Sequence, residues 1–265
     1  MNNTIYFYKF HGAGNDFILI DNRDGHFDVN PKRIAAMCHR RLGIGADGLM
    51  LLNASERYAF EMMYFNADGK EGTMCGNGGR SIVAFAQMLG VVGEKCEFSA
   101  IDGIHIAEVL QRDNQNWEIK LQLNDVNDIK QLSGTDFFLD TGSPHFVRFV
   151  DRISDVNIKK EGKKLRYDRS INEAGSNVNF VEQTKKELFA VTYERGVEDI
   201  TLSCGTGVTA VAIVQALRQN LDSGTIPVRT DGGLLQVSFQ RKKNSFENIF
   251  LQGPVQLVFE GKYQY

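Results

Sequence analysis

The chain has 265 residues, enough for one large domain or for two of ordinary size. Hydrophobic residues make up 42% and charged residues 24%, a globular composition that excludes a wholly disordered chain. The net charge of −3 gives no electrostatic footprint for nucleic acid or an anionic membrane, so neither is an expected partner. No apolar run reaches the roughly 20 residues of a membrane span. Residues 1–4 do not open a secretory signal, so we expect a cytoplasmic protein.

Runs of β-branched and aromatic residues predict strands along the whole chain. In chain order they cover residues 5–10, 17–21, 58–65, 117–123, 146–150, 188–193 and 255–259. Helical periodicity predicts helices only over residues 31–42, 81–89 and 208–217, and the last two are apolar nearly all round. A helix that is apolar on every side must be buried. We therefore expect a mixed α/β (α+β-like) fold in which a curved, largely antiparallel sheet wraps a central helix.

A weak internal duplication organises the chain. At an offset of 130, residues 12–21 align with residues 142–151 and Gly45 aligns with Gly175. At an offset of 128, residues 65–67 align with residues 193–195. At an offset of 129, residues 74–78 align with residues 203–207. Four matches in order, at nearly constant offset, predict two similar halves joined near residues 118–135. We expect the equivalent sites of the halves to face each other across a cleft.

Two of the four cysteines lie in this duplicated context. Cys75 and Cys204 each follow a short strand and precede a Gly-x-Gly that opens a helix, whereas Cys38 and Cys96 fit small buried hydrophobes. The free N–H groups and dipole of a helix N-terminus stabilise a thiolate and can also bind a carboxylate. Two such thiols on opposite faces of one carbon could invert its configuration, since one removes a proton and the other delivers one.

Three other kinds of site compete with this interpretation. Zinc is disfavoured because no Cys-x-x-Cys occurs and no histidine lies at ligand spacing from a cysteine. A Cys/His hydrolase would pair His145 with one cysteine and leave the other unexplained. Residues 43–48 and 205–210 match glycine-rich dinucleotide patterns, but the first follows a helix and the second only a short strand. We expect no metal and no other cofactor.

The motifs resemble those of the diaminopimelate epimerase family. The resemblance covers nearly the whole chain and rests on residues 11–17 (HGAGNDF), 65–69 (FNADG), 74–80 (MCGNGGR), 142–145 (GSPH), 193–196 (YERG) and 203–207 (SCGTG). It implies a cofactor-independent isomerase that converts LL-diaminopimelate to meso-diaminopimelate, for lysine and peptidoglycan precursors. It also implies two pseudo-symmetric domains, residues 1–118 with a returning last strand 256–265, and residues 119–255.

The same resemblance assigns roles to individual residues. Cys75 and Cys204 would be the acid–base thiols, with His145 and Glu194 tuning them. Backbone N–H groups of the pairs Gly76-Asn77 and Gly205-Thr206 would hold the reacting carboxylate. The other expected substrate-binding residues, some of them for the distal amino-carboxylate group, are Asn15, Asn66, Asn177, Glu194 and Arg195. A guanidinium beside a carboxylate suits such a distal group, because each matches one of its charges.

The sequence departs from the family pattern at two positions. Ser143 replaces an asparagine, which shortens or removes one contact to the distal end of the substrate, and Gly48 stands where some members carry glutamine. An amino-acid racemase is therefore the alternative within the family, and a non-enzymatic interaction module is the alternative outside it. We consider a homodimer as the assembly of this protein. The sequence alone decides neither the oligomeric state nor which cysteine is the resting thiolate.

Overall fold

The computed structural model describes residues 4–185 and 187–264, and they form two compact units. Unit 1 comprises the chain up to Leu121 together with the segment from Gly253 onward, and unit 2 comprises Gln122–Gln252. The sequence-based division was 118/119 and 255/256. Tyr265, the last residue of the predicted returning strand, lies outside the described residues.

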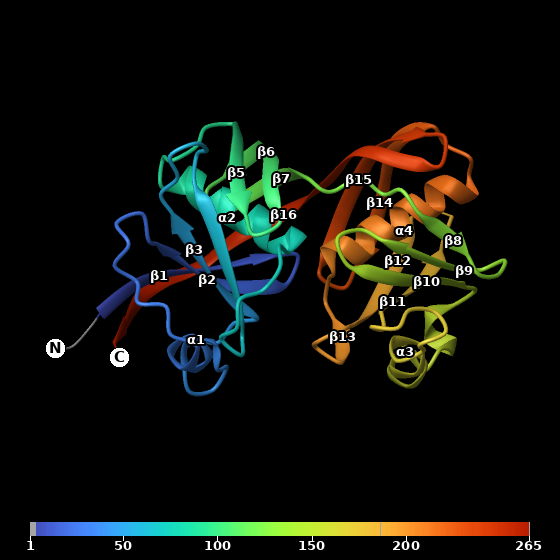
Figure 1. Cartoon of the computed structure of the whole chain (residues 1–265), viewed down its shortest axis with the longest axis horizontal. Helices are drawn as coiled ribbons and strands as arrows, with labels where there is room; N and C mark the ends of the chain where they lie inside the picture. The colour runs from blue at the N-terminus through green and yellow to red at the C-terminus, as the bar shows by residue number, and fades with distance from the viewer. Residues whose placement is uncertain (1–3, 186, 265) are drawn as a thin grey trace. The chain divides into compact units, whose positions relative to one another are not determined.

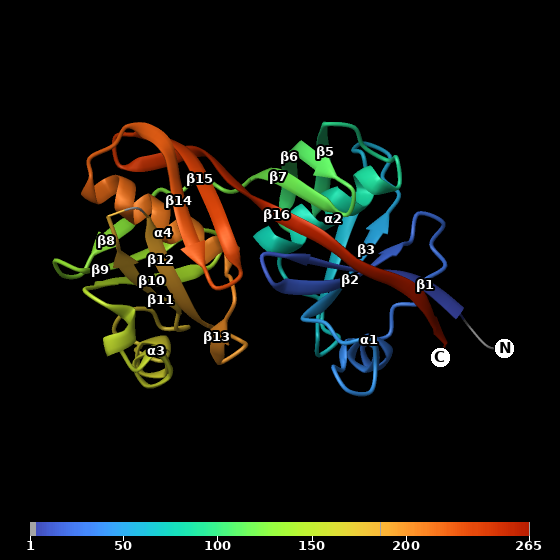
Figure 2. The same cartoon turned by 180° about the vertical axis from the view of Figure 1, so that it is seen from behind.

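In unit 1, a mostly antiparallel sheet encloses one buried helix (Figures 1 and 2). Its elements are β1 (Thr4–Gly12), β2 (Asn15–Asp21), α1 (Pro31–Cys38), β3 (Gly48–Asn53), β4 (Glu61–Asn66), α2 (Gly76–Met88), β5 (Lys95–Ala100), β6 (Gly103–Asp113), β7 (Asn116–Gln122) and part of β16 (Ser245–Gln264). Strand β16 pairs with both β7 and β1, which closes the sheet around α2. Residues 76–86 of α2 are all buried, as the apolar sequence of this helix predicts.

Unit 2 repeats this arrangement. Its elements are β8 (Ile129–Gln131), β9 (Asp136–Asp140), β10 (Pro144–Val150), the 3-10 helix η1 (Ile153–Asp155), α3 (Ile158–Arg166), β11 (Asn177–Gln183), β12 (Leu188–Glu194), β13 (Asp199–Thr201), α4 (Gly205–Arg218), β14 (Ser223–Thr230), β15 (Gly233–Lys242) and the first part of β16. Helix α4 is the buried helix of this unit, with residues 207–216 all buried.

The pairing of the strands shows the internal repeat directly. In unit 1, β1 to β6 pair in the order antiparallel, parallel, antiparallel, parallel, antiparallel. In unit 2, β9, β10, β11, β12, β14 and β15 pair in the same order and senses. Helices α1 and α3 occupy equivalent places, as do α2 and α4. The predicted fold class, two pseudo-symmetric halves that each wrap a buried helix, is confirmed.

The first predicted helix is shorter than expected. The pattern predicted residues 31–42, but α1 ends at Cys38, because the N–H groups of Ile44 and Gly45 turn back onto the Met37 carbonyl. A side chain at position 43 would lie 2.1 Å from the Ala36 carbonyl oxygen, so the chain needs glycine at this close approach. The two buried helices instead begin earlier than predicted, at Gly76 and Gly205. No helix in the described part of the chain is long and apolar enough to cross a membrane.

Candidate active site

The two duplicated cysteines occupy the same place in their respective units. Cys75 is the N-cap of α2, with φ −115° and ψ 127°, and Cys204 is the N-cap of α4, with φ −120° and ψ 112°. Each carbonyl accepts the first helical hydrogen bond, from Gly79 N at 2.7 Å and Val208 N at 2.8 Å, but neither side chain caps its helix. Both thiols therefore lie beside the positive end of a helix dipole, where a thiolate is stabilised.

The second glycine of each Cys-Gly-x-Gly is approached closely by a strand side chain. A Cβ on Gly78 would lie 2.1 Å from Cε of Met50, and a Cβ on Gly207 would lie 2.5 Å from Oδ1 of Asn179. Such distances are shorter than any normal contact, so these glycines let strand side chains approach the first helical turn. The motif thus serves the packing of the helix start as well as the chemistry of the thiol.

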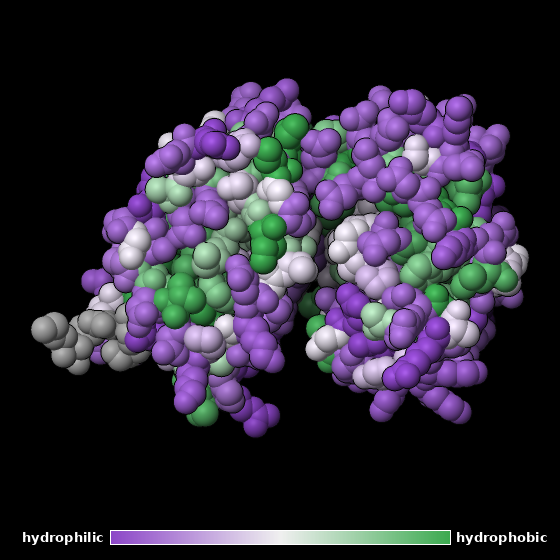
Figure 3. Space-filling view, in the orientation of Figure 1, coloured by the Kyte–Doolittle hydropathy of each residue, from purple (hydrophilic) through white to green (hydrophobic). Residues whose placement is uncertain are grey.

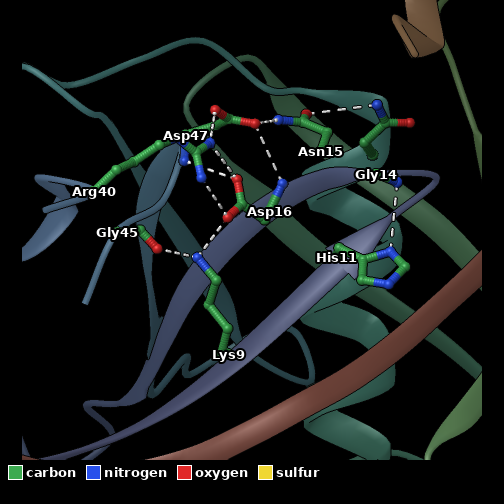
Figure 4. Close-up of polar contacts among 9 residues, drawn as sticks. Lys9, His11, Gly14, Asn15, Asp16, Arg40, Gly45 and Asp47 are labelled. Atoms are coloured by element: carbon green, nitrogen blue, oxygen red, sulfur yellow. Dashed lines mark hydrogen bonds and ion pairs between the residues drawn. The ribbon is translucent and has the colours of Figure 1, made fainter. Parts of the chain in front are cut away.

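In unit 1, Asn15 joins Cys75 to a charged cluster. Its side-chain oxygen accepts from the Cys75 thiol at 3.6 Å and from Asn77 Nδ2 at 3.5 Å. Its side-chain nitrogen donates to Asp47 at 2.6 Å, as Figure 4 shows. Because the carboxylate can only accept, it orients the amide with the oxygen toward Cys75. Two predicted binding residues and one predicted acid–base thiol are therefore in direct contact.

The charged cluster behind Asn15 contains two acids and two bases (Figure 4). Lys9, which is almost fully buried, donates to Asp16 and to the Gly45 carbonyl, and Arg40 donates to Asp16 at 2.7 Å and to Asp47 at 2.5 Å. Burial alone would raise the pKa of Asp16, but hydrogen bonds from Arg40 and Lys9 hold it well below its ordinary value. Burial and the neighbouring Asp16 charge raise the pKa of Asp47.

A buried arginine lies in the first turns of α2. Arg80 has no exposed surface and donates to the Gly76 carbonyl at 3.1 Å and to Asn77 Oδ1 at 2.8 Å. Burial lowers the pKa of Arg80 to about 10, a shift that is opposed by the negative charges of Cys75 and Glu118. The guanidinium stays protonated at neutral pH, so it fixes the predicted binding residue Asn77 and supplies positive charge near Cys75.

In unit 2, Thr206 connects His145 to Cys204. The Nε2 atom of His145 is 2.9 Å from the Thr206 hydroxyl, which is 3.5 Å from the Cys204 sulfur. His145 is completely buried, and burial together with the charge of Arg195 lowers its pKa to about 3. The imidazole is therefore neutral at physiological pH. It reaches Cys204 through the threonine hydroxyl, so the predicted tuning role of His145 has a physical route.

Asn177 connects three further predicted residues. Its Nδ2 donates to the Ser143 hydroxyl at 2.8 Å and to the Pro144 carbonyl at 3.3 Å, and its Oδ1 accepts from the Arg195 backbone N–H at 2.8 Å. The Ser143 hydroxyl is also 3.2 Å from His145 Nε2. Ser143, where the family pattern has asparagine, is thus part of the hydrogen-bonded group around His145.

The remaining predicted residues stand at strand ends. Asn66 is exposed at the end of β4, opposite Gly48 in the register, and Glu194 is half-buried at the end of β12, opposite Asp199. Their assignment to the substrate stays a prediction. At the other two cysteines, burial raises the pKa of Cys38 to about 12 and that of Cys96 to about 11. Neither of these thiols is activated.

Sequence reasoning missed the residues that support the site. Asp47 lies in the segment Gly45–Gly48, which drew attention only for its glycines, and Arg40 lies in the turn after α1. Asn179 is two residues beyond Asn177 on β11 and contacts His145. Since side chains two apart on a strand share a face, the predicted position of Asn177 was a signal that could have found Asn179.

Comparison with known proteins places these features in a family. A family model described as diaminopimelate epimerase matches residues 7–127 and 137–258. The diaminopimelate epimerase of Flavobacterium psychrophilum is 48% identical over 258 residues, covering 96% of this chain and 98% of the relative. That of Chlorobaculum tepidum is 41% identical over 255 residues, covering 94% and 98%.

Solved structures with far lower identity share the fold. A Bacillus anthracis phenazine biosynthesis protein of the PhzF family superposes with a TM-score of 0.78 at 13% identity, covering 98% of this chain and 99% of the other. A hydroxyproline epimerase from Agrobacterium vitis superposes with a TM-score of 0.74 at 13% identity, covering 98% and 91%. The family model and the near-complete coverage of the two diaminopimelate epimerases confirm the resemblance: the chain belongs to the diaminopimelate epimerase family.

Proposed function

We propose that the protein is a cofactor-independent isomerase that interconverts LL- and meso-diaminopimelate, with Cys75 and Cys204 as its acid and base. Membership of the family supports the reaction, and the observation that carries the assignment of the thiols is their equivalent position. Each is the N-cap of the buried helix of its unit. By contrast, Cys38 is the last residue of α1 and Cys96 lies in β5.

The proposed reaction inverts one carbon by moving two protons. One cysteine, as thiolate, takes the proton from the α-carbon, and the electron pair is delocalised onto the carboxylate as an enolate-like species. The other cysteine, as thiol, gives its proton to the opposite face and becomes the thiolate. The α-proton is a very weak acid, so stabilisation of the carboxylate is decisive. Backbone N–H groups of Gly76, Asn77, Gly205 and Thr206 are proposed to supply it.

The proposed substrate has a second amino-carboxylate group. We assign its recognition to Asn66, Asn177, Glu194 and Arg195, since an ammonium suits Glu194 and a carboxylate suits the guanidinium of Arg195. A site built for buried polar groups rejects analogues that leave those groups unpaired, often by factors of about 10⁴. Lysine, proline and glutamate should therefore be turned over poorly. A panel of amino acids analysed by chiral chromatography tests this, and rapid inversion of proline with inert diaminopimelate would favour the racemase alternative.

The thiol roles have a direct isotopic test. In heavy water each turnover should place solvent deuterium on the product α-carbon, while substrate recovered early stays largely unlabelled, because the two faces are served by different thiols. Replacing Cys75 or Cys204 by alanine should reduce epimerisation to background, and Cys96→Ala is the matched control that should retain activity. Equal early labelling of substrate and product, or an active Cys204→Ala variant, would contradict the two-thiol mechanism.

We also propose that the protein acts in the cytoplasm as a homodimer. The surface of unit 1 supports the assembly, because the paired strands β16 and β1, and β6 one strand further along the sheet beyond β7, expose large hydrophobic side chains. They are Tyr6, Ile104, Ile106, Leu110, Val258 and Phe259. Hydrophobic side chains also gather in patches between hydrophilic ones on the face drawn in Figure 3. Analytical ultracentrifugation should give twice the chain mass, and Phe259→Glu should lower it to that of a single chain.

A further inference from the structure

Asn179 is a fully buried polar residue that the proposed reaction does not use. It lies on β11, on the same face as Asn177. Its Nδ2 is 3.1 Å from Nδ1 of His145 and donates to the Phe146 carbonyl at 2.9 Å, and its Oδ1 accepts from the Thr192 hydroxyl at 2.8 Å. Every polar atom of the amide is therefore engaged, and one of its contacts is the imidazole of the site.

The Phe146 carbonyl fixes which way this amide points. A carbonyl oxygen can only accept, so it must face the nitrogen of Asn179 and not the oxygen. A reversed amide would place two carbonyl oxygens against each other in a buried position, which is costly. Since the nitrogen carries two hydrogens, one is directed to Phe146 and the other to Nδ1 of His145. Nδ1 therefore faces a donor and accepts.

The proton of the imidazole must then be on the other ring nitrogen. His145 is neutral at physiological pH, so it carries a single ring proton. Nε2 faces the hydroxyls of Thr206 at 2.9 Å and Ser143 at 3.2 Å, and both can accept. The Asn177 nitrogen is 3.4 Å away, but its two hydrogens already bond the Ser143 hydroxyl and the Pro144 carbonyl. All these contacts are compatible with an Nε2–H.

We propose that Asn179 is a positioning residue that holds the His145 proton on Nε2 and so directs a chain of hydrogen-bond donors onto Cys204. Along this series of hydrogen bonds, Asn179 donates to His145 and His145 donates to the Thr206 hydroxyl. Thr206 then donates to the Cys204 sulfur, 3.5 Å away. Donors aimed at sulfur favour the thiolate. The catalytic meaning rests on the proposed function, because it makes Cys204 the base that is ready before substrate binds.

The tautomer can be read directly by NMR. In protein labelled with ¹⁵N-histidine, a long-range ¹H–¹⁵N correlation spectrum distinguishes the protonated ring nitrogen from the bare one, and a His145→Gln variant assigns the signal among the five histidines. The wild type should show His145 protonated on Nε2. In Asn179→Asp a carboxylate faces Nδ1 and can only accept, so the proton should move to Nδ1. Thr192→Val, which leaves both Asn179 donations in place, should keep it on Nε2.

Kinetics and alkylation separate positioning from folding. Because a wrong tautomer removes the donor chain, Asn179→Asp should lower kcat on the order of 100-fold or more. It should leave KM within about threefold, since Asn179 holds no substrate, and Thr192→Val should change neither strongly. Without substrate, iodoacetamide should label Cys204 of Asn179→Asp at least about tenfold more slowly than in the wild type, corresponding to roughly 1.4 kcal/mol. Labelling of Cys75 is the internal reference.

Two results would overturn the inference. One is a wild-type His145 protonated on Nδ1, which needs no variant and stands even if Asn179→Asp fails to fold. The other is a folded Asn179→Asp protein whose proton stays on Nε2. Failure of the proposed function would look different: the wild type would show the Nε2–H tautomer but would not epimerise diaminopimelate.

Discussion

Asp47 acts on the site through a single side chain, Asn15. It accepts from Asn15 Nδ2 at 2.6 Å and thereby turns the Asn15 oxygen toward Cys75. Its pKa is raised by burial and by Asp16, so folding makes the charged form of Asp47 less favourable than it is in the unfolded chain. The useful property of Asp47 is consequently its acceptor oxygen, and the negative charge itself adds no stability.

Substitutions at position 47 can separate these two properties. Asp47→Ala removes the acceptor, and loss of a hydrogen bond to a charged group costs about 1.5–3 kcal/mol, so kcat/KM should fall about tenfold or more. Asp47→Asn keeps an oxygen for Asn15, so it should stay within about threefold of the wild type, with a melting temperature that is equal or higher. Steady-state kinetics and thermal unfolding check both variants. Equal loss of activity in the two would show that the charge, and not the acceptor, matters.

The residues predicted from sequence are those that motifs mark along the chain. Cys75 and Cys204 could be found because each is followed by the glycines of a helix start, and His145 because it stands in a duplicated segment. Asp47 and Asn179 act through residues that are distant in sequence or on a neighbouring strand. Their roles arise from the register of β11 with β10 and from the turn after α1, which a single sequence does not display.

At the scale of elements, most of the residues proposed for catalysis lie at the starts of α2 and α4. Each start is tightly packed against a strand side chain, Met50 for Gly78 and Asn179 for Gly207. The Met50 and Asn179 side chains differ in how easily they can move. The end of a methionine side chain is flexible, whereas the Asn179 amide is held by three hydrogen bonds. The same substitution should therefore have different consequences in the two units.

Alanine at these two glycines tests this difference. Gly207→Ala should displace Asn179 and lower kcat about tenfold or more, and overpacking should cost roughly 1–3 kcal/mol of unfolding free energy. Gly78→Ala should keep more activity, because Met50 can move aside. Gly93→Ala, where a Cβ meets nothing within 4 Å, is the matched control. Steady-state kinetics and urea unfolding provide the comparison, and a Gly78→Ala variant as damaged as Gly207→Ala would contradict the argument.

Helix α3 shows why some elements escaped prediction. Its sequence is strongly basic and has a glycine in the middle, which lowers helix propensity by about 1 kcal/mol. The structure gives the reason for this glycine, since a Cβ on Gly162 would lie 2.7 Å from Cβ of Tyr193. Ile158, Gly162 and Leu165 form the buried face, so a helical period is present. It was hidden because a small residue occupies one of the three buried positions.

At the scale of the whole molecule, the duplication was the strongest prediction. Offsets of 128 to 130 residues relate the duplicated segments, and the order and sense of strand pairing repeat in the two units. Gly45 and Gly175, which align in the sequence, both adopt a positive φ, 81° and 69° respectively. Both glycines follow the first helix of their unit, so the repeat extends to single backbone conformations.

The buried imidazole of His145 makes the stability of the whole fold sensitive to acid. His145 has its pKa lowered to about 3 in the folded protein, from an ordinary 6.5. Between these values the unfolded chain binds a proton that the folded protein does not, so the free energy of unfolding must fall as the pH falls below 6.5. For one proton the slope approaches roughly 1.4 kcal/mol per pH unit. Asp16, whose pKa is lowered from 3.8, adds its own loss only at still lower pH.

Comparison with a variant that cannot titrate at this position isolates the effect. Urea unfolding followed by circular dichroism at pH 7.5, 6, 5 and 4.5 should show the wild type losing about 3 kcal/mol more than His145→Gln, since all other groups are common to both proteins. His26→Gln, an exposed histidine, is the matched control and should follow the wild type. Parallel pH dependences of the wild type and His145→Gln would mean that the buried imidazole takes up its proton without unfolding, which its complete burial and its bonds to Asn179 and Thr206 oppose.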